Sequence, residues 1–120
     1  RPSMRSTVDP ERVWRVLIIR QPWLDLILAG EKTMEIRGSS CREGRVLLAE
    51  SGTGLVFGAV DIVRAKPIFT WGRFCQLEAK HCVDASSLGA LPYRSTFAWH
   101  LERARRLPSG PVPYHHKTGA

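Results

Sequence analysis

Cysteine is scarce in this chain of 120 residues, and its spacing argues against two classes of small domain. The three cysteines, Cys41, Cys75 and Cys82, are an odd number, and no two of them have Cys-x-x-Cys spacing. A disulfide framework or a zinc site is therefore not expected, and free thiols fit a reducing compartment. The adjacent His115 and His116 point apart on an extended chain and make a poor metal pair. We predict no metal site and no cofactor.

Long apolar runs are also missing. The longest run falls far short of the roughly 20 residues that a membrane helix needs, and no secretory hydrophobic region is present. We therefore predict no membrane contact and a cytoplasmic location, and the sequence predicts no particular protein partner. Residues 1–12 are polar without periodicity, which predicts a flexible arm whose residues 1–3 are a cloning remnant before Met4. Residues 13–120 then form one domain.

Acidic residues are few. The chain has 11 Asp and Glu against 18 Lys and Arg, which gives a net charge of +7 and a pI near 10.0. A small basic domain favours a polyanionic partner, most often nucleic acid. A general bias toward solubility produces the same composition, because net charge by itself defines no site.

Motifs of the common catalytic folds are absent as well. The sequence has no P-loop, no nucleophile elbow and no metalloprotease spacing. His81, close to Glu78, has the chemistry of a general base, although an isolated histidine is more often a surface residue. An enzymatic activity is therefore not indicated by any short motif.

Residues 14–37 contain the clearest structural pattern. Residues 14–19 are rich in Val, Ile and Leu and predict a buried strand. Pro22 suits the first position of a helix, which Gly30 would end. From Thr33 onward polar and apolar residues alternate up to residue 37, which predicts a second strand.

The rest of the chain predicts short strands joined by turns and short helices. Gly58 indicates a bulge or bend of the kind that small barrels need, and Pro67 is expected to end its strand. Such elements favour a small barrel or rolled sheet. The further predicted elements are strands at 45–50, 55–63 and 96–101, a hairpin turn at 51–54, and helices at 70–81 and 85–91.

Lys32, Glu35 and Arg37 form the first candidate site. A strand here aims Thr33, Glu35 and Arg37 at one face, with Lys32 at the corner beside them. Arg suits bidentate recognition of a phosphate or a base, and Lys supplies a point charge. The alternative is a solvated strand face with weak local ion pairs.

Other candidates surround this cluster in the sequence. Arg20 leaves the end of a strand and can reach the same cleft, and Trp23 would either stack on a base or anchor its helix in the core. The basic residues outside the cluster are candidates for phosphate contacts, although each alone is more often solvated surface. They are Arg64, Lys66, Arg73, Lys80, Lys117 and, as the best candidates, Arg103, Arg105 and Arg106. Tyr93, Trp99 and Tyr114 would line a base pocket or, for Trp99, pack in the core.

The residues Gln21-Pro22-Trp23, followed by Gly30-x-Lys32-x-x-Glu35-x-Arg37, resemble the signature of the ASCH domain, a branch of the PUA-like superfamily. The segments at 93–101 and 111–114 are similar to the closing portion of that family. The resemblance implies an α+β fold, a small mixed β-barrel of five to six strands with short capping helices. It also implies a cleft beside the barrel, holding RNA or a modified nucleoside, at Lys32, Glu35 and Arg37.

The resemblance leaves the question of catalysis open. Some relatives are ribonucleases, for which Lys32 and Glu35 would be the catalytic pair. Another branch removes acetyl from N4-acetylcytidine with Lys, Thr and Glu, and there the threonine stands three places after the lysine. Glu35 occupies that position here. We therefore predict a module that binds nucleic acid, with RNA or another single strand as the expected ligand. The alternative is a hydrolase, either a ribonuclease or an enzyme that acts on a modified nucleoside. A protein-interaction adaptor is the third hypothesis.

Overall fold

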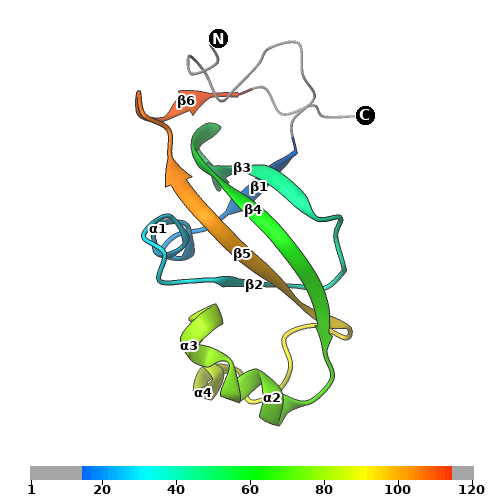
Figure 1. The fold of residues 1–120 in the computed structure, drawn as a ribbon. Helices are drawn as coiled ribbons and strands as arrows, with labels where there is room; N and C mark the ends of the chain where they lie inside the picture. The colour runs from blue at the N-terminus through cyan, green and yellow to red at the C-terminus, as the bar shows by residue number, and fades with distance from the viewer. Residues whose placement is uncertain (1–14, 115–120) are drawn as a thin grey trace.

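The computed structural model describes residues 15–114, so the predicted N-terminal arm lies outside the described residues. Six strands form one curled sheet in the order β1-β3-β4-β5-β2, with β6 paired to β4 (Figure 1). This half-barrel with short helices confirms the predicted α+β class and the predicted number of strands. The strands are β1 (Val16–Ile19), β2 (Met34–Arg37), β3 (Gly44–Glu50), β4 (Leu55–Ile68), β5 (Thr96–Arg106) and β6 (Val112–Pro113). The helices are α1 (Trp23–Leu28), α2 (Trp71–Gln76), α3 (Glu78–His81) and α4 (Ala85–Leu88).

The predicted strand–helix–strand unit is present as β1, α1 and β2. The strand β1 pairs in parallel with β3, while the other ladders are antiparallel. Gln21 fixes the turn between β1 and α1: its side-chain amide nitrogen donates to Glu50 at 2.9 Å, and its oxygen accepts from the backbone of Asp25. Pro22 stands just before the helix, and Gly30 follows the helix end at φ +80°, a left-handed conformation that glycine adopts without strain.

The two long strands run further than predicted. Pro67 does not end β4, which continues to Ile68. The partner β3 stops at the level of Ile62, so beyond it one edge of β4 is free of β3, and a proline lacking an N–H is tolerated there. The strand β5 extends to Arg106, past the predicted end at residue 101, because it continues to pair with β4 through two register shifts.

Glycine and local caps shape the remaining connections. A Cβ at Gly58 would lie 2.2 Å from the carbonyl oxygen of Arg105, and the β3–β4 register shifts beside Gly58, as the predicted bulge requires. The helix predicted at 70–81 divides into α2 and α3 at Leu77. Asp84 caps the last helix by accepting from the backbone of Ser86.

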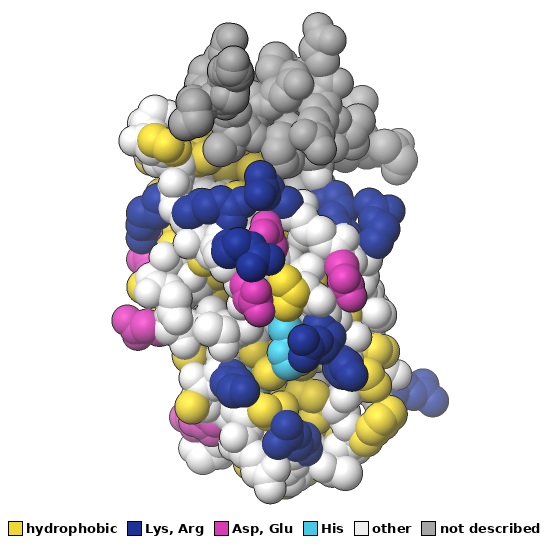
Figure 2. All heavy atoms as spheres, viewed as in Figure 1, with side chains coloured by type: hydrophobic (Ala, Val, Ile, Leu, Met, Phe, Trp, Pro, Cys, Tyr) yellow, Lys and Arg dark blue, Asp and Glu magenta, His cyan; other side chains and the backbone are white. Residues whose placement is uncertain are grey.

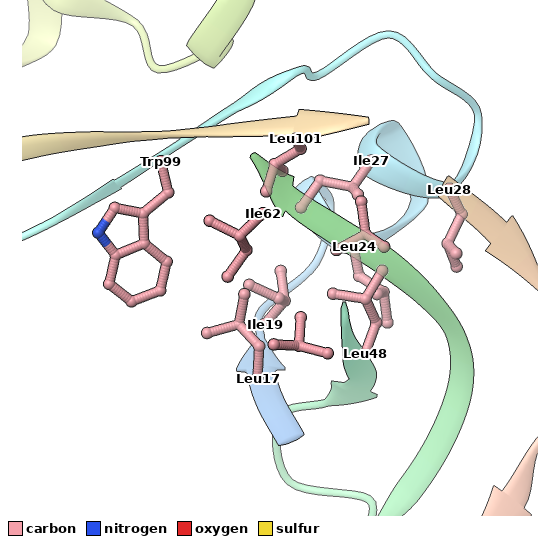
Figure 3. Packing of buried hydrophobic residues seen from close by; sticks show 11 residues of the cluster. Leu17, Ile19, Leu24, Ile27, Leu28, Leu48, Ile62, Trp99 and Leu101 are labelled. Atoms are coloured by element: carbon pink, nitrogen blue, oxygen red, sulfur yellow. The ribbon is translucent and has the colours of Figure 1, made fainter. Parts of the chain in front are cut away.

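Three apolar clusters hold these elements together. Leu24 and Ile27 of α1 are fully buried against the concave side of the sheet, where Ile62 and Trp99 also lie (Figure 3). A second cluster, centred on Phe74, packs α2, α3 and α4 against one end of β2, β4 and β5. The helices therefore close one end of the half-barrel, and α1 fills its inside.

Candidate functional site

A hollow of about 430 Å³ opens between β1 and β2, the two strands at the ends of the sheet path. We call it the Glu35 pocket. It brings together six residues selected from the sequence. Tyr93 comes from a later loop, and the other five come from the segment from the end of β1 to β2: Arg20, Trp23, Lys32, Glu35 and Arg37.

Glu35 is the centre of the charges in this pocket. Its carboxylate lies 3.6 Å from Nζ of Lys32 and 2.7 Å from Nε of Arg37. The pairing follows from the local structure, because residues 35 and 37 share one face of β2 and residue 32 precedes that strand. Glu35 is almost buried, whereas the side chain of Arg37 is 31% exposed. The pocket thus has an anionic floor and a cationic rim.

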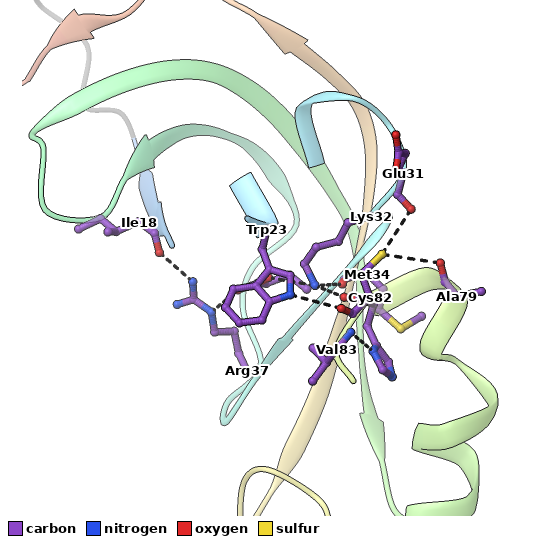
Figure 4. Close-up of polar contacts among 11 residues, drawn as sticks. Ile18, Trp23, Glu31, Lys32, Met34, Arg37, Ala79, Cys82 and Val83 are labelled. Carbon is purple, nitrogen blue, oxygen red and sulfur yellow. Dashed lines mark hydrogen bonds and ion pairs between the residues drawn. The ribbon is translucent and has the colours of Figure 1, made fainter. Parts of the chain in front are cut away.

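Lys32 lies under the pocket, buried and held by the protein itself. Its ammonium donates to the carbonyl oxygen of Met34 at 2.9 Å and to that of His81, besides its ion pair with Glu35 (Figure 4). Burial lowers the pKa of Lys32, and the charge of Glu35 opposes that effect. Two donors of the ammonium thus bind carbonyl oxygens of the protein and its charge pairs with Glu35, so Lys32 positions Glu35 and α3.

Arg37 spans the open side of the half-barrel. One of its terminal nitrogens donates to the carbonyl oxygen of Ile18 at 3.0 Å (Figure 4). Its guanidinium lies 5.5 Å from the ring centre of Trp99. Arginine suits this position because its planar fork satisfies several acceptors at once. The side chain therefore joins β2 to β1 where the sheet leaves them unpaired.

Two aromatic side chains line the pocket. Trp23 is half-buried, packs against the core and donates from Nε1 to the carbonyl oxygen of Cys82 at 3.4 Å, so it anchors α1 and still faces the pocket. Tyr93 is 44% exposed, and its ring packs against Gly38, where an added Cβ would approach it to 3.0 Å. Tyr93 is one of three aromatic residues that the sequence offers for a base pocket, and it lines this pocket.

The structure places other predicted residues elsewhere. Thr33 is exposed and does not line the pocket. Trp99 is buried and donates from Nε1 to Ser39, as its core alternative required. Tyr114 packs against the cluster under β3 and β4, away from the pocket.

The three late arginines lie on β5 and do not line the Glu35 pocket. Arg103 and Arg105 both approach the carboxylate of Asp61, at 2.7 and 3.5 Å, and Arg106 lies 3.5 Å from Asp25. Burial alone would raise the pKa of Asp61, but hydrogen bonds from Arg103 and Arg45 outweigh it and lower the pKa.

Sequence reasoning misjudged His81 and missed Ser51. His81 is fully buried: Nε2 lies 2.9 Å from the carbonyl oxygen of Phe74, and Nδ1 accepts from the backbone of Val83. This pattern fixes the neutral tautomer, and burial lowers the pKa, so the ring is part of the core. Ser51 lines the pocket because its backbone N–H donates to Ile19. Only its place in the predicted hairpin turn could have indicated it.

Residues 15–114 contain no group of three or more His, Cys, Asp or Glu that could hold a metal ion. Among the same residues, no helix is long and apolar enough to span a membrane.

Comparison with known proteins identifies the family. The model of the ASCH domain matches residues 17–109. The chain belongs to the ASCH domain family. No curated protein matches it. Crystal structures of ASCH from Zymomonas mobilis share the fold of this ASCH domain: the S128A mutant has a TM-score of 0.66 at 13% identity, over 82% of this chain and 72% of that one.

The crystal structure of ASCH from Zymomonas mobilis that is described without a mutation has a TM-score of 0.63 at 11% identity, over 83% of this chain and 86% of that one. At this level of identity the likeness concerns the fold alone. The predicted family and the PUA-like type of fold are confirmed.

Proposed function

We propose that this ASCH domain binds RNA, or another single-stranded nucleic acid, by taking one nucleotide into the Glu35 pocket. The observation that carries the proposal is the composition of that pocket. A hollow of about 430 Å³ combines a buried carboxylate, two rim cations and two aromatic rings. Single-stranded nucleic acids are bound by this combination of stacking surfaces and basic groups.

Each group has a distinct task in this proposal. Arg20 is exposed at the rim and has no carboxylate partner among the described residues, so it is the first candidate for a phosphate. Glu35 accepts hydrogen bonds from a base edge or a ribose hydroxyl. Trp23 and Tyr93 stack on the base, a contact worth about 1–3 kcal/mol per base. Lys32 holds Glu35 in place.

The overall charge supports the same partner. A net charge of +7 attracts a polyanion over distances near the Debye length of about 8 Å at physiological salt. Binding should therefore weaken as salt rises, with a log–log slope of about −0.7 for each phosphate that a single strand places on the protein. A cytoplasmic location, where RNA and a reducing milieu coexist, belongs to this proposal.

Fluorescence anisotropy of a labelled single-stranded RNA, titrated at several salt concentrations, tests the proposal. Tyr93→Ala should weaken binding about tenfold, since the loss of one stack is worth about 1.4 kcal/mol. Arg20→Ala should weaken binding and make the salt slope shallower by about 0.7. Arg42→Ala removes the same charge from an exposed loop outside the pocket and serves as the control. Equal binding by Tyr93→Ala, Arg20→Ala and the wild type would overturn the proposal.

A hydrolase is the second candidate, and one observation favours it. Lys32 has a lowered pKa and lies 3.6 Å from Glu35, an arrangement suited to proton transfer. The exposed Thr33 lies outside the pocket, so the family branch that acts on N4-acetylcytidine through threonine is the less favoured form. Turnover of RNA and of N4-acetylcytidine by the wild type, compared with Lys32→Ala and Glu35→Ala, decides it. Turnover that neither substitution changes would come from a contaminant.

A further inference from the structure

A second hollow, of about 300 Å³, lies on the opposite face of the β2–β5 ribbon. In that ladder Met34 stands opposite His100, and Glu35 stands opposite Trp99. Because side chains alternate along a strand, Glu35 faces the first pocket while Met34 faces the second. We call the second hollow the His100 hollow. Its floor is apolar, and its walls come from β4, α2 and α3.

Four cations surround this hollow, and no carboxylate lines it. Arg64 and Lys66 come from β4, Arg73 from α2 and Lys80 from α3. All four are exposed, and among the residues described none of them is ion-paired. Figure 2 shows Lys and Arg side chains beside exposed histidine atoms on this face, with hydrophobic side chains below.

The other basic clusters of the domain differ in this respect. In the Glu35 pocket a carboxylate lies between Lys32 and Arg37. On the upper part of β5, Asp61 lies between Arg103 and Arg105 and is ion-paired with both. The His100 hollow is the place, within residues 15–114, where cations from three elements converge without an anion to balance them. Like charges held together in a folded protein repel one another unless an anion joins them.

His100 reports the electrostatics of the hollow. Its ring is half-buried at the centre, facing Arg64 and Lys66 on β4, Arg73 on α2 and Lys80 on α3. Burial lowers the pKa of His100, and the charges of Arg64, Lys80 and Lys66 lower it further. The nearest acid on its own strand, Glu102, is ion-paired with Arg103.

We propose that the His100 hollow binds a phosphate group, which either a nucleic-acid backbone or free phosphate supplies. The cations offer charge-assisted hydrogen bonds from three directions, which suits a tetrahedral anion. The neutral imidazole of His100 adds one N–H donor, or two once it is protonated. The site is separate from the Glu35 pocket, so it does not require that pocket to bind RNA.

The first test uses inorganic phosphate, with the ring signals of His100 followed by NMR against pH. Phosphate should raise the pKa of His100, whereas sodium chloride at the same ionic strength, which only screens the cations, should raise it less. In the double variant Lys66→Gln, Lys80→Gln the effect of phosphate should fall at least severalfold. The matched control is Arg42→Gln, Arg94→Gln, which removes two charges from exposed positions that line neither hollow. Equal shifts with phosphate and chloride would overturn the proposal.

The second test distinguishes the two sources of phosphate. If a nucleic acid is the source, single-stranded RNA should perturb His100 at lower concentration than phosphate does, and the Lys66, Lys80 double variant should bind RNA more weakly. If free phosphate is the source, phosphate alone should perturb His100. No response of His100 to either probe would overturn this inference, but it would not affect the proposal that the Glu35 pocket binds a nucleotide. Conversely, loss of RNA binding in the double variant, with Tyr93→Ala unchanged, would overturn the proposed function and support the inference.

Discussion

The guanidinium of Arg37 and the carbonyl oxygen of Ile18 form a 3.0 Å hydrogen bond across the opening of the half-barrel. The sheet path places β1 and β2 at its two ends, so this contact joins strands that share no ladder. The same side chain makes a 2.7 Å ion pair with Glu35. Arg37 therefore links the stability of the fold to the shape of the pocket.

Replacing Arg37 by lysine should destabilise the protein although the charge is kept. A single ammonium does not reproduce the fork that reaches Glu35 and Ile18 together. Hydrogen bonds to charged groups contribute about 1.5–3 kcal/mol, so the free energy of unfolding in urea should fall by about 1–3 kcal/mol. The surface change Arg42→Lys should stay within about 0.5 kcal/mol of the wild type. Equal stability of the two variants would contradict the bridging role.

Lys32 and Glu35 should behave as a coupled pair when their charges are removed. Lys32→Met leaves Glu35 with one partner fewer and deprives two buried carbonyl oxygens of their donor. Breaking a buried pair typically costs about 3–5 kcal/mol. The double variant Lys32→Met, Glu35→Met should be less destabilised than the sum of the two single variants. Urea unfolding of the three variants gives the coupling energy, and simple additivity would argue against a coupled pair.

Acid should destabilise the protein through His81. The folded state lowers the pKa of this buried histidine below its ordinary value of 6.5. Between these two pKa values the unfolded chain binds a proton that the folded chain does not. The free energy of unfolding should therefore decrease as the pH falls below about 6.5, by at most about 1.4 kcal/mol per pH unit from this group.

His81→Phe removes the titration and keeps a ring against Phe74, whose centre lies 4.2 Å from that of His81. The variant is expected to be less stable at pH 7, because the backbone N–H of Val83 loses its acceptor. Its stability should nevertheless depend less on pH between 7 and 5. Denaturation curves across that range provide the measurement. An unchanged slope would show that His81 is protonated equally in both states.

Gly58→Ala should destabilise the fold, because the added Cβ would meet the carbonyl oxygen of Arg105 at 2.2 Å and the side chain of Leu28 at 2.7 Å. Overpacking of this kind costs about 1–3 kcal/mol or more. Gly72→Ala is the matched control: it stands in α2 with nothing within 4 Å of the added Cβ. That change should stabilise the helix by up to about 1 kcal/mol. Thermal unfolding of the two variants should move in opposite directions.

The sequence was sufficient for the unit that carries the pocket. Strand periodicity, Pro22 and Gly30 are local signals, and they placed β1, α1 and β2 within two residues of their observed starts and ends. The ends of β4 and β5 were not predictable in this way, because they depend on which neighbours each strand has. Pro67 is tolerated only because β3 stops before it.

The pocket itself was predictable only in part. Lys32, Glu35 and Arg37 are close in sequence, so alternation along one strand brings them together. Ser51 and Tyr93 come from distant turns, and their positions follow from long-range pairing that no local pattern records. The burial of His81 likewise depends on α2 and α3 packing against each other. Isolated polar residues therefore remain ambiguous until their neighbours are known.

The hydrogen bond between Arg37 of β2 and Ile18 of β1 lies at the entrance of the Glu35 pocket. Within residues 15–114 no ladder hydrogen bond joins these edge strands, and the hydrogen bond from Arg37 to Ile18 spans the opening between them. Rotation of one arginine about its own bonds would widen the entrance while every strand keeps its partner. In the proposed binding of a nucleotide, the rotamer of Arg37 would therefore control access to the Glu35 pocket while the pairing of the strands stays unchanged.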